Sequence, residues 1–367
     1  MNHYMPVHVF TGEYAVSKNE IEFSRYGKRC ALITGKSSAV KSGALQDVTD
    51  TLTRLGVAFC VYDGISQNPS VESCISGGRF ADQFRADFII GIGGGSALDA
   101  AKAVAVFAAN PELDEAHFYQ KLWQEDPLPV LLVGTTAGTG SEVTKVSVLT
   151  DSSGKKHSIH DDRLFARAAF GDPRYTMSLP ASVTLSTGID VLSHCAESFF
   201  NRKADEISRA FAIRGIQLLY EPLLKAAKGE TLSLIQREEL YNASIMGGLA
   251  ICGTGTCFPH NVGYYLTENY GLPHGFASAA FLPALLFMVR EKEPDYAAQF
   301  YRELGITEEA LLHLLQVTLP VNQIRMTEEE IRAVLPRWEN NNSVLNTCCE
   351  ISTEEIREIL VQEFIKG

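Results

Sequence analysis

The sequence predicts an α/β fold with two parts, an N-terminal domain built on a parallel sheet and a C-terminal domain made only of helices. In the first half of the 367-residue chain, short runs rich in Val, Ile and Leu alternate with helical patterns. Such continuous apolar strands, separated by helices, are typical of a parallel sheet covered on both faces. From about residue 179 onward helical periodicity dominates. We therefore expect one domain over residues 1–173 and a second over residues 174–367.

The elements follow from the same patterns. Four strands are expected over residues 30–34, 57–62, 87–91 and 129–134, each an apolar run that ends at a turn, and a helix over 96–109 follows the third strand. In the second domain, helices are expected over residues 197–225, 233–250, 275–290 and 352–365, with another that starts after Ser186 or Thr187.

Composition excludes several classes of protein. Hydrophobic residues make up 46% of the chain and charged residues 21%, which is typical of a globular protein. The net charge of −12 argues against a nucleic-acid or anionic-membrane partner. No apolar run reaches the roughly 18 residues of a membrane span, and no secretory signal is visible. Eight scattered cysteines without a CxxC pair indicate reduced cytosolic thiols rather than a disulfide scaffold. Together these observations favour a cytoplasmic enzyme.

A glycine-rich loop, residues 91–96, follows the third strand and opens a helix. Three consecutive glycines, Gly93, Gly94 and Gly95, would let the backbone approach a pyrophosphate, and the helix N-terminus would supply N–H donors. Asp99 in the first helical turn suits a helix cap as well as a ribose contact. Taken alone, the loop is equally well explained as a tight turn that needs glycine.

Two more polar loops follow predicted strands. Residues 135–142, with the sequence TTAGTGSE, combine hydroxyls and glycines that suit ribose and phosphate, although a polar loop that caps a helix would look similar. Residues 35–38, with the sequence GKSS, offer a lysine and two hydroxyls to a phosphate, or form a solvated turn. Because parallel strands end at one edge of a sheet, the loops together predict a dinucleotide site there.

One aspartate and three histidines are candidate metal ligands. Asp190 and His194 are four residues apart, so on a helix they project from the same face. His260 and His274 flank a Gly-Leu-Pro break that can turn two helices toward one point. One carboxylate with imidazoles suits Zn²⁺ or Fe²⁺. Taken singly, a histidine near an apolar face is more often a hydrogen-bonded core residue, and the Asp190–His194 pair alone does not decide between the two.

Four motifs in order, GIGGGSALDAAKA, TTAGTGSEVT, TGIDVLSHCAE and LPHG, resemble the iron-containing (type III) alcohol dehydrogenases over roughly residues 25–290. The resemblance implies a dinucleotide-binding α/β domain and an all-helical metal domain. It implies NAD(P)-dependent interconversion of small primary alcohols and aldehydes, Fe²⁺ or Zn²⁺ as the metal, and a homodimer or larger homo-oligomer. The implied metal ligands are Asp190, His194, His260 and His274.

The resemblance also implies where the cofactor binds. Four features of the family's cofactor site have counterparts here. They are the pyrophosphate loop, the Thr/Gly loop for the ribose and nicotinamide half, an Asn-Pro pair, and a lysine after a short hairpin. The implied cofactor contacts are Gly35, Lys36, Ser37, Asn68, Gly93, Gly94, Gly95, Ser96, Asp99, Thr135, Thr136, Thr139, Lys156 and Leu179.

Two departures from the family pattern affect the predicted function. NAD-preferring members often carry an aspartate after the first strand, whereas this chain offers Lys36 there, so we expect NADP(H) rather than NAD(H). A generic Rossmann pattern would instead point to Asp63 after the second strand and favour NADH. Many relatives carry a further histidine four residues after the third ligand. Here that residue is Tyr264, a candidate catalytic proton relay, with Tyr265 as a competing candidate. The cofactor ribose with bound water is the other candidate source of the proton, and the sequence does not choose between them.

The expected reaction is hydride transfer from the nicotinamide to an aldehyde whose oxygen lies on the metal. One alternative is a polyol oxidoreductase of the glycerol dehydrogenase kind, a branch that uses three protein ligands. A lyase of the dehydroquinate synthase kind should need Lys and Arg near the metal, and the metal segments are poor in both. A dinucleotide-binding sensor without chemistry is disfavoured by the complete ligand set.

Overall fold

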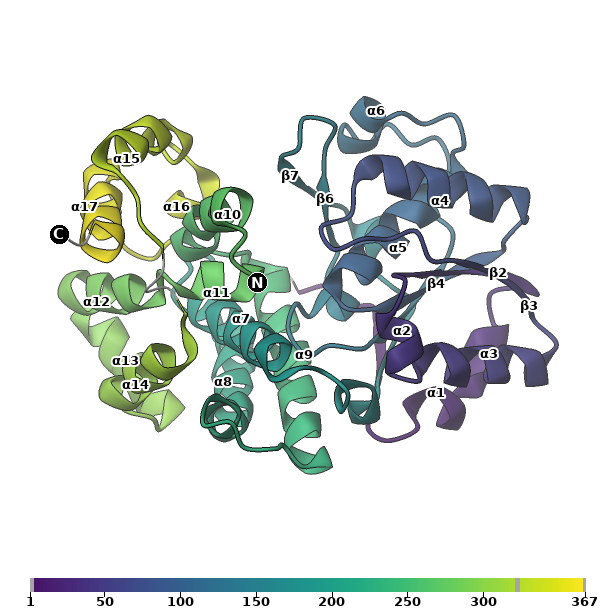
Figure 1. Cartoon of the computed structure of the whole chain (residues 1–367), viewed down its shortest axis with the longest axis horizontal. Coiled ribbons are helices and arrows are strands. Elements are labelled where there is room, and N and C mark those ends of the chain that lie inside the picture. The colour runs from purple at the N-terminus through teal and green to yellow at the C-terminus, as the bar shows by residue number, and fades with distance from the viewer. Residues whose placement is uncertain (1–2, 321–323, 366–367) are drawn as a thin grey trace. The chain divides into compact units, whose positions relative to one another are not determined.

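The computed structural model describes residues 3–320 and 324–365, and the chain forms two compact units (Figure 1). The sheet unit contains residues 4–180 and 233–248, and the helical unit contains His3, residues 181–232 and the described residues from 249 onward. The predicted division at residue 173 remains a prediction. A segment from much later in the chain, residues 233–248, completes the sheet unit.

The sheet unit contains a six-stranded sheet in which every neighbouring pair of strands is parallel. The fold class and the four predicted strands are confirmed. The two further strands, β1 and β8, were not predicted because each has only four residues and a weak apolar pattern. In sheet order the strands are β1 (His8–Thr11), β8 (Ala168–Gly171), β5 (Val130–Gly134), β4 (Phe88–Gly93), β2 (Arg29–Thr34) and β3 (Ala58–Tyr62).

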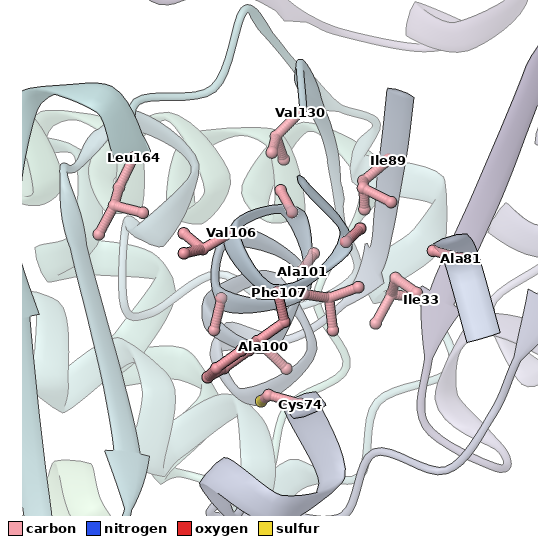
Figure 2. Packing of buried hydrophobic residues seen from close by; sticks show 14 of the residues in the cluster. Ile33, Cys74, Ala81, Ile89, Ala100, Ala101, Val106, Phe107, Val130 and Leu164 are labelled. Carbon is pink, nitrogen blue, oxygen red and sulfur yellow. The ribbon is translucent and has the colours of Figure 1, made fainter. Parts of the chain in front are cut away.

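Helices cover both faces of the sheet, because successive strand residues point to opposite sides. On one face, Ile33 and Ile89 pack in a core with helix α5 (Gly95–Ala109) and helix α4 (Val71–Gln83). Figure 2 shows this core, with Ala100 and Ala101 of α5 and Cys74 of α4. On the other face, Leu32 and Ile90 pack with helix α3 (Ala44–Leu55). The remaining elements of this unit are α1 (Ala15–Lys18), α2 (Ser38–Lys41), α6 (Glu115–Tyr119) and the antiparallel hairpin of β6 (Val146–Thr150) and β7 (Lys156–His160).

Helix α9 (Leu234–Thr254) contributes its first four turns to the sheet unit. Its Tyr241 lies against the glycines that end β5 and β8. A Cβ added to Gly134 would lie 2.1 Å from the Tyr241 hydroxyl, and one added to Gly171 would lie 2.1 Å from the Tyr241 ring. Glu142 accepts a hydrogen bond of 2.6 Å from the same hydroxyl. The tyrosine therefore fills a gap that only glycine can leave open.

The rest of the described chain is helical apart from short turns, as predicted. No described helix is long and apolar enough to span a membrane. The helices are α7 (Ala181–Phe199), α8 (Glu206–Ala227), α10 (Phe258–Tyr270), α11 (His274–Ala279), α12 (Leu282–Lys292), α13 (Pro294–Leu304), α14 (Glu308–Thr318), α15 (Glu328–Val334), α16 (Asn342–Leu345) and α17 (Thr353–Phe364).

Some predicted helix limits are wrong. The helix expected over residues 197–225 is two helices, because Asp205 caps α8 by accepting the N–H groups of Ile207 and Ser208. The helix expected over residues 275–290 is also two, since α11 ends at Ala279 and α12 begins at Leu282. Helix α7 begins at Ala181, one to two turns before the predicted start.

Candidate metal centre and cofactor loops

The four predicted metal ligands come together in the helical unit. Three imidazole nitrogens surround one carboxylate oxygen, Asp190 Oδ1. His260 Nε2 lies 3.6 Å from it, His274 Nε2 3.9 Å and His194 Nε2 4.0 Å. Metal–ligand bonds of about 2.0–2.2 Å place ligand atoms roughly 3–4 Å apart. The ligand atoms of Asp190, His260 and His274 all lie within 4.8 Å of one another, so these three residues fit one divalent ion. His194 lies beside this group but is not part of it.

The candidate ligands come from three helices. Asp190 and His194 lie one turn apart on α7, His260 lies in the first turn of α10, and His274 opens α11. Gly271 ends α10 with φ 65°, a left-handed conformation that suits glycine. A Cβ added to Gly275 would lie 1.9 Å from the Ser186 carbonyl oxygen of α7. Glycine at that position lets α11 approach α7 closely.

Burial and hydrogen bonding also fit a metal ligand set. Asp190, His194 and His260 are buried, with 2–5% of their surface exposed. Among the described residues, the buried His260 Nε2 has no hydrogen-bond partner. A buried nitrogen that faces a carboxylate without a hydrogen bond is costly unless something else binds there. The His274 side chain remains 29% exposed, so the group of ligands is accessible from that side.

The electrostatics of the centre favour a cation. Burial raises the pKa of Asp190, but the attraction of His194, His274 and His260 has the larger effect. These three histidines hold the pKa of Asp190 well below its usual range. Burial lowers the pKa of His260, but the nearby carboxylates of Glu197 and Asp190 have the larger effect and raise this pKa to about 10. Positive charge is therefore stabilised at the point where the four side chains meet.

Sequence reasoning missed two residues that support the ligands. Glu197 Oε1 accepts a 2.5 Å hydrogen bond from His260 Nδ1, and the Ser278 hydroxyl donates to Asp190 Oδ1 at 3.1 Å. The sequence contains one indication that Glu197 belongs to the site, which is its spacing from two candidate ligands. Asp190, His194 and Glu197 are spaced by four and three residues, so they share one face of α7.

The two candidate tyrosines of α10 have different surroundings. The Tyr264 ring stacks on His274, with ring centroids 5.4 Å apart. The Tyr265 hydroxyl donates to Glu330 at 2.8 Å, and its ring packs edge-on against Trp338. The structure thus places Tyr264 against a predicted metal ligand, while the Tyr265 hydroxyl is bound by α15. A proton-relay role for Tyr264 remains a prediction.

In the sheet unit, the glycine loop (residues 91–96) lies directly against the Thr/Gly loop (residues 135–142). A Cβ added to Gly95 would lie 2.5 Å from Thr139 Cγ2, and one added to Gly94 would lie 3.0 Å from Thr136 Oγ1. Gly94 and Gly95 are therefore needed partly because a larger side chain would collide with the Thr/Gly loop. Among the described residues, the buried Thr135 Oγ1 has no hydrogen-bond partner, which suits an oxygen or nitrogen of a bound cofactor.

Asp99 and Lys102 join α5 to the neighbouring loop and hairpin. The Asp99 carboxylate accepts the Ser141 hydroxyl and, at 3.0 Å, the Val148 N–H. The fully buried Lys102 ammonium donates to Ser141 Oγ at 2.8 Å and to the Val146 carbonyl at 2.7 Å. A ribose contact for Asp99 remains a prediction. Lys102 was missed, although a lysine in an Ala-rich apolar helix is an available signal.

The first-strand loop lies beside the glycine loop. Gly35, Lys36 and Ser37 follow β2, whose last residue pairs with Ile92 of β4. A Cβ added to Gly93 would lie 3.7 Å from Ser38 Oγ.

The other predicted contacts are Asn68, Lys156 and Leu179. The Asn68 N–H donates to Ser96 Oγ at 3.3 Å, and the Asn68 carbonyl accepts the Thr150 hydroxyl at 3.3 Å. Thr150 pairs with Lys156 in the β6–β7 hairpin. Leu179 follows β8, and its N–H donates to the Thr176 carbonyl at 3.2 Å. Asn68 thus joins the glycine loop to the hairpin that carries Lys156.

Comparisons with known proteins cover both units. The sequence-family model of the iron-containing alcohol dehydrogenases matches residues 6–173. The family model of the C-terminal part of the Fe-containing alcohol dehydrogenases matches residues 184–362. Long-chain-alcohol dehydrogenase 1 of Geobacillus thermodenitrificans is 34% identical over 77% of this chain and 72% of its own length.

Solved structures agree with this match. An iron-containing alcohol dehydrogenase from Thermotoga maritima is 33% identical, with a TM-score of 0.91 over 100% of this chain and 99% of that one. A sulfoacetaldehyde reductase from Bifidobacterium kashiwanohense, solved with NAD⁺, is 26% identical, with a TM-score of 0.90 over the same shares.

Proposed function

Because this chain belongs to the iron-containing alcohol dehydrogenase family, we propose that it interconverts small aldehydes and primary alcohols with a nicotinamide cofactor and a divalent metal ion. One observation carries the proposal: three imidazole nitrogens lie 3.6–4.0 Å from Asp190 Oδ1. A fourth ligand, which we assign to His194, would separate it from the glycerol dehydrogenase branch. A dehydroquinate-synthase-like lyase is not favoured, because residues 181–200 and 254–289 contain neither Lys nor Arg.

The side chains of Asp190, His194, His260 and His274 would hold the ion, with Fe²⁺ as the proposed occupant and Zn²⁺ as the alternative. When bound, the ion supplies Lewis acidity to a carbonyl oxygen and the reduced nicotinamide supplies the hydride. The exposed side of His274 is where a substrate would reach the ligands. Tyr264 stacks on that residue, so we assign to its hydroxyl the proton that converts an alkoxide to an alcohol.

The cofactor contacts are proposed on the loops at the carboxyl ends of β2, β4 and β5. Backbone N–H groups of residues 93–96 at the start of α5 would bind the pyrophosphate. The hydroxyls of Thr135, Thr136 and Thr139 would bind the ribose and nicotinamide half. Lys156 of the hairpin would add a positive charge.

We propose that NADPH is preferred over NADH. The support is the position of Lys36, an exposed lysine in the loop after β2, beside the glycine loop. Asp63 follows β3, one strand farther from β4 in the sheet. An exposed cation near the pyrophosphate loop would favour a 2′-phosphate, whereas an aspartate there would repel it.

The test is cofactor oxidation by Fe²⁺-reconstituted protein with a panel of short aldehydes, comparing NADPH with NADH and adding a chelator to a parallel series. Chelator-sensitive turnover that is faster with NADPH supports the proposal. Turnover that a chelator leaves unchanged refutes the metal assignment. Metal-loaded protein that turns over none of the aldehydes with either cofactor refutes the proposed reaction.

A further inference from the structure

We infer that Glu197 is a positioning residue that presents Nε2 of His260 to the metal ion and thereby sets the metal affinity of the centre. The inference rests on the proposed function, because it takes His260 as a metal ligand. It concerns a buried carboxylate that contacts a ligand from behind, on the side of the imidazole ring away from Asp190.

The two oxygens of Glu197 bind different parts of the same segment. Oε2 accepts the backbone N–H of Cys257 at 2.7 Å and that of His260 at 3.4 Å, at the start of α10. Oε1 accepts the His260 ring Nδ1 at 2.5 Å and the Ser193 hydroxyl at 2.9 Å. One carboxylate therefore fixes both the backbone and the ring of His260.

This arrangement determines which ring nitrogen can bind a metal. A carboxylate only accepts hydrogen bonds, so His260 carries a proton on Nδ1. In the neutral ring, Nε2 then has the lone pair, and it lies 3.6 Å from Asp190 Oδ1. Hydrogen bonds of this kind behind a ligating histidine orient the ring and raise its basicity.

The charge of Glu197 also suits a divalent ion. Its side chain is fully buried, and a buried charge is costly unless it is balanced. With neutral imidazoles, Asp190 and Glu197 supply two negative charges to the centre. These balance the two positive charges of Fe²⁺ or Zn²⁺.

A purely structural role for Glu197 makes a different prediction. Cys257, the N-cap residue of α10, makes no side-chain capping hydrogen bond, and Glu197 Oε2 takes over that function. If capping were the whole role, substitution of Glu197 would lower stability and leave the metal affinity of the folded protein unchanged. Metal affinity measured without cofactor or substrate separates the two roles.

The test is Zn²⁺ affinity of the full-length Glu197→Gln variant, measured by competition with a chelator and compared with wild type. Glutamine has one acceptor oxygen and one donor nitrogen, so it cannot accept from the ring and the backbone with both atoms. We expect affinity to fall about 10–100-fold. We also expect an altered visible absorption spectrum after Co²⁺ loading, because the ring moves. Folded Glu197→Gln that binds Zn²⁺ within about threefold of wild type, with an unchanged Co²⁺ spectrum, overturns the inference.

Glu142→Gln is the matched control, since Glu142 is a buried carboxylate of the sheet unit. Its Zn²⁺ affinity should equal that of wild type, and an equal loss there would overturn the inference. If Glu197→Gln does not fold, Glu197→Asp replaces it, because aspartate keeps the charge and shortens the reach. We expect a smaller loss of affinity for Glu197→Asp, and no loss overturns the inference. Zn²⁺ binding that depends on Glu197, in protein without aldehyde turnover, supports this inference and refutes only the proposed reaction.

Discussion

The phenol ring of Tyr264 lies nearly parallel to the imidazole of His274, with 11° between the ring planes and 5.4 Å between the centroids. The tyrosine therefore contacts a proposed metal ligand through its ring, while its hydroxyl is the proposed proton donor. The two contributions can be separated, because phenylalanine keeps the ring and lacks the hydroxyl.

We expect Tyr264→Phe to lower kcat about 100-fold, the lower range for loss of a general acid, and to keep wild-type Zn²⁺ affinity. Tyr264→Ala should lower kcat similarly and also weaken Zn²⁺ binding, because the stack on His274 is lost. Steady-state kinetics and chelator competition measure the two effects. Wild-type kcat in Tyr264→Phe would show that the proton comes from another group.

Replacing His260 or His274 with alanine should abolish metal retention and turnover. Cofactor binding should remain, because the proposed cofactor loops belong to the sheet unit. Metal content after dialysis and the fluorescence of bound NADPH are the measurements. His313→Ala on α14 is the matched control, since that histidine is exposed, and it should retain metal. Full activity of either ligand variant would disprove its assignment.

Lys36→Asp should reverse the proposed preference for NADPH. A negative charge near the 2′-phosphate would repel NADPH and leave NADH unaffected, so we expect the ratio of kcat/KM values to shift toward NADH by at least about tenfold, or about 1.4 kcal/mol. Lys41→Asp makes the same charge change at the end of α2 and should shift the ratio less than Lys36→Asp. An unchanged ratio in Lys36→Asp would contradict the cofactor proposal.

Lys102→Met should destabilise the protein by about 3 kcal/mol. The substitution removes a buried cation from Asp99 and leaves the Ser141 and Val146 acceptors without that donor. We also expect weaker NADPH binding, because Ser141 belongs to the Thr/Gly loop. Urea unfolding and cofactor titration test the two effects. Wild-type stability would show that the Lys102 contacts contribute little to the fold.

The stability contribution of Glu142 should depend on pH. Burial raises the pKa of Glu142, and the Tyr241 hydrogen bond only partly opposes it. The folded protein therefore binds a proton at higher pH than the unfolded chain does. As the pH falls from 7 toward the unfolded value near 4.5, wild type should gain free energy of unfolding relative to Glu142→Gln. Urea unfolding of both proteins across this range measures the difference, and a difference that is constant with pH would contradict the prediction.

The sequence was sufficient for most of the parallel sheet because its strands are continuous apolar runs. Residues 88–92, for example, are all buried and could hardly form a surface element. The ends of α7 and α8 were not predictable in the same way. Residues 197–199 continue a helical pattern, and the break depends on how Asp205 satisfies the first N–H groups of α8.

Residue type and spacing made the four proposed metal ligands candidates, and the resemblance to the family selected them. Spacing also places Glu197 on the same face of α7 as Asp190 and His194, but it does not show what Glu197 contacts. Glu197 and Cys257 are 60 residues apart, and only the packing of α7 against α10 brings the carboxylate to that N–H. The same holds for Lys102, whose hydrogen-bond acceptors lie about 40 residues later. Long-range pairs of this kind leave no periodic signal in a single sequence.

The place of Tyr241 between the ends of β5 and β8 limits how this chain can be cut or recombined. A fragment that stopped after residue 180 would contain all six strands of the sheet but no α9. It would expose Gly134 and Gly171 and leave Glu142 without the Tyr241 hydroxyl. A chimera that exchanges the N-terminal half between two relatives must therefore also exchange residues 233–248. The sheet unit therefore cannot be transferred as one continuous stretch of sequence, although most of it precedes the helical unit in the chain.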